Sequence, residues 1–213
     1  MMNFNEKQVL ILSPHTDDGE LSAGGTITRC IEECADVYYV AFSSCEKSVP
    51  KGYDCNILQH ECIAATHELG IPKNNIQFFN YEVRDFPLHR QEILEDMIHL
   101  HSEIQPDIVI TPSSFDVHQD HHVIHMESVR AFKKDATILG MEHPWNNLTF
   151  KNDVTVTLSK EQLERKISAL KQYVSQNARD YFSSEYITAL ARTRGLNVYS
   201  EFAEVFECIR IIF

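Results

Sequence analysis

The chain has 213 residues, of which 43% are hydrophobic, and it carries a formal net charge of −12. That length and apolar content predict one globular domain over residues 1–213. The acidic balance argues against nucleic acid or an anionic membrane surface as a partner, because both demand a basic face. The apolar runs are too short to cross a bilayer, and the N-terminus lacks the basic start and apolar stretch of a signal peptide. We therefore expect a cytoplasmic protein without a stable membrane anchor.

Strands and helices are expected to alternate through the first two thirds of the chain. The pattern predicts strands at 9–13, 36–42, 76–79 and 107–111, and helices at 23–34, 56–69, 89–102 and 122–132. Short, continuously apolar strands that alternate with helices indicate a parallel sheet covered on both faces. The predicted fold class is therefore α/β, with three layers and a mostly parallel central sheet.

The last third of the chain is less regular. A strand is expected at 154–158, and Ser159 with Gln162 forms the pattern of a capping box. The helix that follows should run from Lys160 to about Ser175. The tail at 204–213 is expected to be one last strand or extended segment.

Two clusters of acidic and histidine side chains follow predicted strands. One is Ser13-Pro14-His15-Thr16-Asp17-Asp18, and the other is Asp116-Val117-His118-Gln119-Asp120-His121-His122. Carboxylates at the end of a buried strand need a compensating partner, because an unpaired buried charge is strongly destabilising. A divalent metal is the expected partner. Ligands of open α/β sheets bind at the carboxyl ends of the strands, so the strands at 9–13 and 107–111 must be neighbours for the clusters to meet.

The residue types in these clusters suit one zinc ion. His15, Asp18 and His121 would supply two imidazole nitrogens and one carboxylate oxygen, with a fourth position left for water. Iron or cobalt could occupy the same ligand set. With this set complete, His122 and His125 are expected to be surface residues.

The remaining polar residues of the clusters suggest acid–base chemistry. Zinc lowers the pKa of a bound water to about 7, and Asp17 is free to accept the proton of that water. His118 could stabilise an oxyanion or protonate a leaving group. Asp120 could orient His118 and raise the pKa of its imidazole.

The six cysteines do not resemble a disulfide framework or a structural zinc site. There is no Cys-x-x-Cys pair, and a cytosolic chain usually keeps its thiols reduced. We expect buried, inert thiols at these positions: Cys30, Cys34, Cys45, Cys55, Cys62 and Cys208.

These motifs resemble the two signatures of the PIG-L/LmbE-like zinc de-N-acetylase family. The matching segments are Pro14-His15-Thr16-Asp17-Asp18-Gly19-Glu20-Leu21, Gly24-Gly25-Thr26-Ile27 and Asp116-x-His118-x-Asp120-His121. Weaker matches are Glu61-x-x-x-Ala65, Leu69-Gly70, Ser175-Gln176, Arg194-Gly195 and Ala203-Glu204-Val205-Phe206. The resemblance implies a Rossmann-like fold and removal of an acetyl group from an N-acetylglucosamine-type sugar. By matching positions it also implies the same zinc ligands, Asp17 as general base, and His118 assisted by Asp120.

Departures from the family pattern concern substrate binding. Thr16 and Gly19 alter the first motif without removing a ligand or the base. Leu58 stands where many members carry a substrate-contacting arginine. Arg84 and Arg194 are candidate replacements, although each could instead form a surface or structural ion pair.

The lone tryptophan, Trp145, is a further candidate for substrate binding. It lies in the polar segment His143-Pro144-Trp145-Asn146-Asn147 and could stack on a sugar face, anchor packing or lie at an oligomer contact. The sequence does not determine the oligomeric state, and a homo-oligomer is compatible with it.

Two other functions use the same residues. A phosphoesterase would share the ligands but would prefer a second metal and a cationic phosphate clamp. A catalytically silent metal- or sugar-binding module is the second alternative. The uncoordinated carboxylate of Asp17 argues against it, because binding alone gains little from that group.

Overall fold

A seven-stranded sheet forms the centre of the computed structural model, which describes residues 3–212. The strands are β1 (Gln8–Ser13), β2 (Asp36–Ala41), β3 (Ile76–Phe78), β4 (Ile108–Pro112), β5 (Thr137–Met141), β6 (Val154–Leu158) and β7 (Phe202–Arg210). Their spatial order is β3-β2-β1-β4-β5-β7-β6. Strands β1 to β5 pair in parallel, and β7 runs antiparallel to both β5 and β6. The predicted α/β class with a mostly parallel sheet is confirmed.

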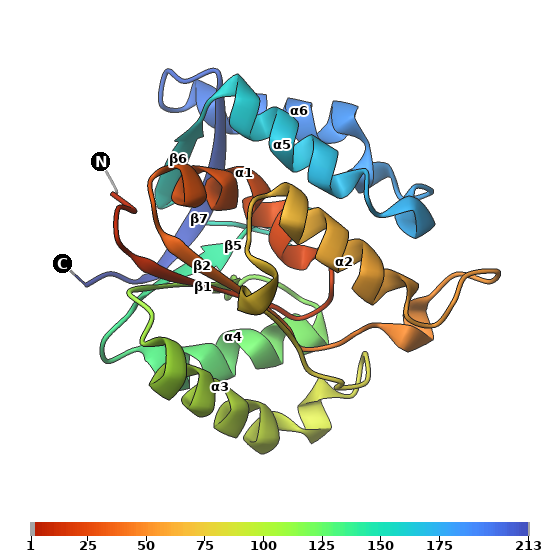
Figure 1. Cartoon of the computed structure of the whole chain (residues 1–213). Helices are drawn as coiled ribbons and strands as arrows, with labels where there is room; N and C mark the ends of the chain where they lie inside the picture. The colour runs from red at the N-terminus through yellow and green to blue at the C-terminus, as the bar shows by residue number, and fades with distance from the viewer. Residues whose placement is uncertain (1–2, 213) are drawn as a thin grey trace.

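Helices cover both faces of this sheet (Figure 1). The α-helices are α1 (Asp18–Glu32), α2 (Ile57–Glu68), α3 (Arg90–Ile104), α4 (Gln119–Phe132), α5 (Lys160–Leu170) and α6 (Ser184–Leu196). Helices α3 and α4 lie on one face, and the other four lie on the opposite face. The three-layer arrangement explains why the four central residues of β1, 9–12, are all apolar, since alternate side chains enter different cores. Val9 and Ile11 pack in the core beneath α1 and α2, whereas Leu10 and Leu12 pack in the core with α3 and α4.

Strand β1 lies between β2 and β4. The strands that precede the two clusters are therefore neighbours, as a shared site requires. Val9 pairs with Ile108, and Ile11 pairs with Ile110. The chain proceeds from β1 outward through β2 to β3 and then crosses back to β4 on the other side of β1. This reversal of direction opens a crevice at the carboxyl ends of β1 and β4.

Two helices begin earlier than the pattern predicts. Helix α1 begins at Asp18 rather than at residue 23, because the first turn contains Gly19 and polar residues that mask the apolar periodicity. Helix α4 begins at Gln119 rather than at residue 122. The His118 side chain accepts a hydrogen bond from the Asp120 N–H and serves as the N-cap. Residues of both clusters therefore lie in first helical turns.

The C-terminal third differs more from its prediction. Ser159 and Gln162 form the expected capping box, but α5 ends at Leu170 instead of about residue 175. The chain leaves the helix there and brings Tyr173, which is fully buried, beneath the site. Strand β5 and helix α6 were not predicted. Gly140 weakens the strand signal of β5, and it is needed because a Cβ there would lie 2.9 Å from the Cα of Ser113.

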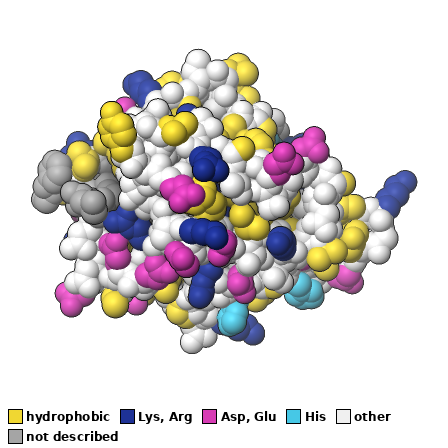
Figure 2. Space-filling view, turned by 90° about the horizontal axis from the view of Figure 1, so that it is seen from above, with side chains coloured by type: hydrophobic (Ala, Val, Ile, Leu, Met, Phe, Trp, Pro, Cys, Tyr) yellow, Lys and Arg dark blue, Asp and Glu magenta, His cyan; other side chains and the backbone are white. Residues whose placement is uncertain are grey.

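Charges are mixed on the surface shown in Figure 2, where basic side chains lie beside acidic ones. Within residues 3–212, no helix combines the length and the apolar character that crossing a bilayer would require.

Candidate active site

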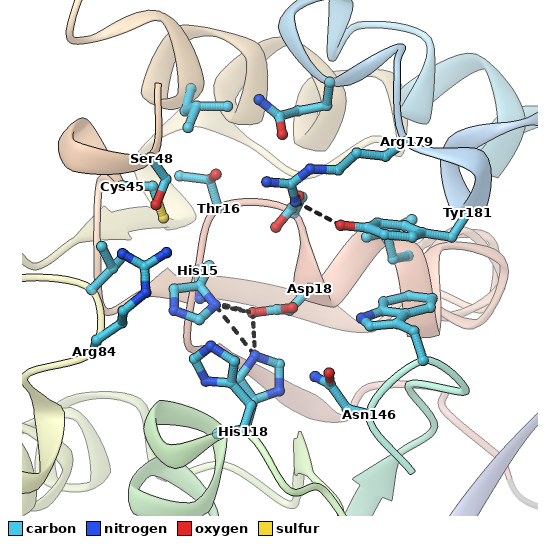
Figure 3. Close-up of a pocket in the computed structure, with 17 residues that line it drawn as sticks. His15, Thr16, Asp18, Cys45, Ser48, Arg84, His118, Asn146, Arg179 and Tyr181 are labelled. Atoms are coloured by element: carbon cyan, nitrogen blue, oxygen red, sulfur yellow. Dashed lines mark hydrogen bonds and ion pairs between the residues drawn. The ribbon is translucent and has the colours of Figure 1, made fainter. Parts of the chain in front are cut away.

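A pocket opens at the carboxyl ends of β1 and β4, where the two clusters meet (Figure 3). Its floor is formed by residues that follow these strands, and its rim by segments near residues 45–48, 83–84, 145–146 and 176–181. The lining residues are His15, Thr16, Asp17, Asp18, Leu21, Cys45, Ser48, Leu58, Val83, Arg84, His118, His121, Trp145, Asn146, Gln176, Arg179 and Tyr181.

Three ligand atoms form a nearly equilateral triangle at the floor. His15 Nδ1 lies 3.1 Å from Asp18 Oδ2, His121 Nε2 lies 3.2 Å from that oxygen, and the two nitrogens are 3.2 Å apart. Ligands placed tetrahedrally about 2.0–2.1 Å from zinc lie about 3.3 Å from one another. The triangle therefore has the size of one face of a zinc coordination tetrahedron.

The other nitrogen of each histidine in the triangle faces a carboxylate. His15 Nε2 lies 3.1 Å from Asp120 Oδ2, and His121 Nδ1 lies 2.8 Å from Asp116 Oδ2. Metal-binding histidines usually have such a carboxylate partner, which fixes the orientation and tautomer of the ring. The donor set and its surroundings thus fit a zinc ion.

The electrostatics of the floor favour positive charge. Burial opposes a charged imidazole at His15, but hydrogen bonds to Asp120 and Asp18 outweigh it and raise the pKa to about 10. At His121 burial also opposes the charge, and the nearby Asp18 and Asp116 raise the pKa to about 9. A cation placed among these carboxylates would gain the same attraction.

His143 and Asp116 belong to this floor, although neither was a predicted site residue. His143 is fully buried, with Nδ1 3.2 Å from Asp116 Oδ2 and Nε2 3.6 Å from Asp18 Oδ1. Neither ring nitrogen makes a well-formed hydrogen bond. Asp18, His121 and His143 together offer ligand atoms within 4.8 Å of one another. The sequence contained one indication of this position. His143-Pro144 follows β5, which pairs with β4, so this histidine also lies at the carboxyl end of a strand next to the site.

Asp17 lies beside the triangle and lines the pocket. Burial and the adjacent Asp18 raise the pKa of its carboxyl group, while the positive charges of Arg179 and His15 act in the opposite direction. The nearest cation is Arg179, whose Nη1 is 3.9 Å from Asp17 Oδ2. Asp17 therefore places a carboxyl group with a raised pKa in the pocket, next to the candidate metal position.

His118 has a defined orientation because its Nδ1 accepts the Asp120 backbone N–H at 3.2 Å. Burial, His121 and His15 lower the pKa of His118 to about 4. The expected contact between the Asp120 carboxylate and His118 is not present. That carboxylate accepts the Arg84 backbone N–H at 2.6 Å and faces His15, because α4 begins early and turns the side chain toward β1.

A buried network supports the first cluster from below. Glu20 accepts a hydrogen bond from the Tyr39 hydroxyl. The Tyr173 hydroxyl lies 2.7 Å from Glu20 Oε1 and 2.6 Å from the Thr16 carbonyl oxygen, so its one proton is shared between these two acceptors. Gly19 is required by this packing, since a Cβ there would lie 2.5 Å from the Tyr39 ring. The departure at position 19 thus reflects the Tyr39 ring that packs against the first turn of α1.

The predicted substrate contacts separate into two groups. Arg84 and Trp145 line the pocket, and so does Leu58. Arg194 does not line it. Its guanidinium pairs with Glu142, with Nε 3.1 Å from Oε2, next to a smaller neighbouring cavity.

Arg179 and Tyr181 were not predicted, but they form much of the rim. The Tyr181 ring stacks on Trp145 with centroids 4.3 Å apart and an interplanar angle of 14°. Arg179 Nη1 donates to the Tyr181 hydroxyl at 2.6 Å. This irregular segment has no periodic pattern or motif from which its place at the rim could be predicted.

All six cysteines are free, as expected. Cys45 lines the pocket, but burial raises the pKa of its thiol to about 12, so a thiolate is disfavoured. Cys30 and Cys62 are also buried, whereas Cys34 and Cys55 are exposed and Cys208 is half-buried. The prediction of burial was therefore wrong for Cys34 and Cys55, which lie on turns outside the core.

The relatives of the chain include deacetylases. It is 28% identical over 176 residues to the uncharacterised deacetylase YaiS of Escherichia coli (strain K12), a match that covers 79% of this chain and 91% of YaiS. The N,N'-diacetylchitobiose deacetylase of Pyrococcus horikoshii superposes with a TM-score of 0.78 at 21% identity, covering 94% of this chain and 83% of that protein. GalB, the 4-carboxy-2-hydroxymuconate hydratase of Pseudomonas putida, superposes with a TM-score of 0.80 at 18% identity, covering 97% and 98%. The two structural matches show a shared fold.

The sequence profile described as PIG-L, GlcNAc-PI de-N-acetylase, matches residues 10–132. That span is more than half of the chain and contains both acidic-histidine clusters. The chain therefore belongs to the PIG-L family and is a deacetylase, an amide hydrolase.

Proposed function

We propose that this protein is a zinc-dependent hydrolase that removes the acetyl group from an N-acetylated amino sugar or a conjugate of one. The triangle of His15 Nδ1, Asp18 Oδ2 and His121 Nε2 carries the proposal. Its dimensions suit zinc, and Asp120 and Asp116 orient the two rings.

Zinc, when bound, would act as a Lewis acid that polarises the acetyl carbonyl and lowers the pKa of water. Asp17 is the general base in this mechanism. Its carboxylate takes a proton from the attacking water and later returns it to the departing amine, so that the C–N bond breaks to give acetate and an amine. The raised pKa of Asp17 brings its basicity closer to that needed near neutral pH.

His118 stabilises the oxyanion. Its Nδ1 accepts the Asp120 N–H, so the proton of the neutral ring lies on Nε2. The lowered pKa keeps the ring neutral near pH 7, and Nε2–H is then free to donate to the developing negative charge. Asp120 contributes through its backbone to His118 and through its carboxylate to His15.

Arg84 and Trp145 are proposed to contact the sugar, since both line the pocket. Trp145 has one ring face stacked on Tyr181, which makes the pair a flat aromatic wall for an apolar sugar face. Arg194 is left out of this set because Glu142 already pairs with its guanidinium.

The test is a screen of the zinc-loaded protein against N-acetylated sugars and sugar conjugates, with acetate and new primary amine both measured. Asp17→Asn protein with bound zinc serves as the matched control. Equal release of acetate and amine that is lost in the control supports the proposal. Release of phosphate from phosphorylated sugars without acetate would favour a phosphoesterase. Zinc and sugar binding without any release would favour a binding module.

A further inference from the structure

The pocket contains arginines that no carboxylate neutralises closely. Elsewhere, Arg29 pairs with Glu33 at 2.7 Å and Arg90 with Glu127 at 2.5 Å. Arg84, by contrast, makes no ion pair within 4.0 Å in the described chain, and Arg179 has only the 3.9 Å approach to Asp17. A distance of 3.9 Å is too long for a charge-assisted hydrogen bond. Both arginines line the pocket beside the candidate metal position, so their guanidinium groups are placed to receive a negatively charged ligand.

The Arg179 guanidinium is held in place before any substrate arrives. Tyr181 accepts one of its N–H groups at 2.6 Å, and the guanidinium carbon lies 5.8 Å from the centroid of the Tyr181 ring. Tyr181 is in turn stacked on Trp145. The segment that carries Arg179 is fixed by Ser175, whose N–H and hydroxyl both donate to the buried Glu61 at 2.8 and 2.6 Å. The remaining N–H groups of Arg179 are available to a ligand.

Arg84 is held through its backbone. Its N–H donates to Asp120 at 2.6 Å, and its carbonyl accepts from Gln119 Nε2 at 2.8 Å. Its φ of 75° is a left-handed conformation that is costly for a residue with a side chain. Figure 3 shows the two arginines on opposite sides of the pocket, with His15 and Asp18 between them.

We propose that the substrate carries a negatively charged group, a phosphate or a carboxylate, and that Arg179 binds it with Arg84 as the second cation of the pocket. This inference rests on the proposed function, since it names the class of acetylated amino sugar. Because Arg179 is next to Asp17, the charged group belongs to the acetylated sugar unit itself or to the substituent attached directly to it. A guanidinium is well suited to either anion because it can donate two parallel hydrogen bonds.

Three probes test the charge requirement: N-acetylglucosamine 1-phosphate, N-acetylmuramic acid and the neutral methyl glycoside of N-acetylglucosamine. The first two separate a phosphate from a carboxylate. Binding is measured by calorimetry with zinc-loaded Asp17→Asn protein, in which turnover should be slow, and KM is measured with the native protein. We expect at least one anionic probe to bind about 10-fold or more tightly than the neutral glycoside, with a preference that weakens as salt is added.

Variants then assign the preference to Arg179. Arg179→Gln should weaken binding of the anionic probe about 10-fold. It should change the affinity for the neutral glycoside by less than about 2-fold. Arg179→Lys should restore part of the loss. Arg192→Gln is the matched control, because Arg192 is an exposed arginine on α6 outside the pocket. A phosphate probe that contacts only the zinc ion would bind the native protein and Arg179→Gln with equal affinity.

The outcomes separate this inference from the proposed function. If Arg179-dependent anion binding is found without acetate release, the inference stands and the proposed function fails. If acetate is released with equal KM from anionic and neutral sugars, or if Arg179→Gln weakens both equally, the function stands and the inference is wrong. Binding of none of the three probes also overturns it.

Discussion

The floor and the rim of the pocket are built in opposite ways. His15, Asp18 and His121 at the floor follow buried strands, and each contacts at least one other charged group within 3.2 Å. The rim residues Trp145 and Arg179 lie in irregular segments and are 37% and, for the side chain, 44% exposed. The floor is densely connected, whereas the rim depends on one aromatic stack and a few hydrogen bonds.

This difference indicates that the floor and the rim have different functions. A metal and a proton acceptor must be placed accurately, so they need the connected floor. Substrate selection can change when a lining residue outside the floor changes, and Leu58 and Arg179 are two such residues. Substitutions in the floor should therefore affect metal binding or turnover, and those in the rim should affect KM.

The largest effect is expected for Asp17→Asn. Asparagine keeps the shape but cannot accept the proton, so kcat should fall about 10²- to 10⁴-fold. Zinc content should stay at one ion per chain, measured by atomic emission. Asp135→Asn, an exposed residue after α4, is the control. Near-full activity of Asp17→Asn would rule out the general-base role.

Metal affinity should fall when the support of the floor is removed. In His143→Gln the ring beside Asp18 and Asp116 is lost, and the zinc affinity should drop about 10- to 100-fold in a chelator competition. His125 is buried, so the predicted surface position was wrong for it. His125→Gln is the matched control, because this ring is buried like that of His143 but bonds to the Pro112 carbonyl. Equal losses in both variants would mean that His143 acts only through packing.

A smaller effect is expected at the rim from Trp145→Ala. The aromatic wall on Tyr181 would be lost, and KM for the sugar should rise about 3- to 10-fold with little change in kcat. Steady-state kinetics on the best substrate of the screen measure both constants. A fall in kcat with unchanged KM would mean that Trp145 affects turnover rather than sugar binding.

The smallest effect on activity is expected from Arg194→Gln. Glu142 is 7% exposed and would lose its partner, which should lower the free energy of unfolding by about 1–3 kcal/mol. KM should stay within about 2-fold of the native value, since Arg194 does not line the pocket. Urea unfolding and kinetics on the same sample check both. A large rise in KM would restore Arg194 as a substrate contact.

Much of the floor could be predicted from the chain alone. His15 and Asp18 follow β1 and His121 follows β4, and the chemistry of carboxylates beside histidines suggests a metal. The position of the site depended only on β1 and β4 being neighbours, which the parallel α/β pattern makes plausible and the topology confirms.

Asp120 and His143 show where local sequence falls short. Asp120 lies two positions after His118, which suggested that these side chains pair, but the early start of α4 turns the carboxylate toward His15. His143 follows a strand that Gly140 disguises, so its burial beside Asp18 depends on β5 packing against β4.

By itself, the sequence determined the alternating α/β fold, the two acidic-histidine clusters and their family resemblance. These are local properties, since each depends on periodicity or on residues within one short segment. Only the tertiary structure decided which nitrogen faces which carboxylate, that Arg194 is neutralised by Glu142, and that Arg179 enters the pocket. Those pairings join residues separated by as many as 162 positions, as for Asp17 and Arg179, and packing alone brings them together.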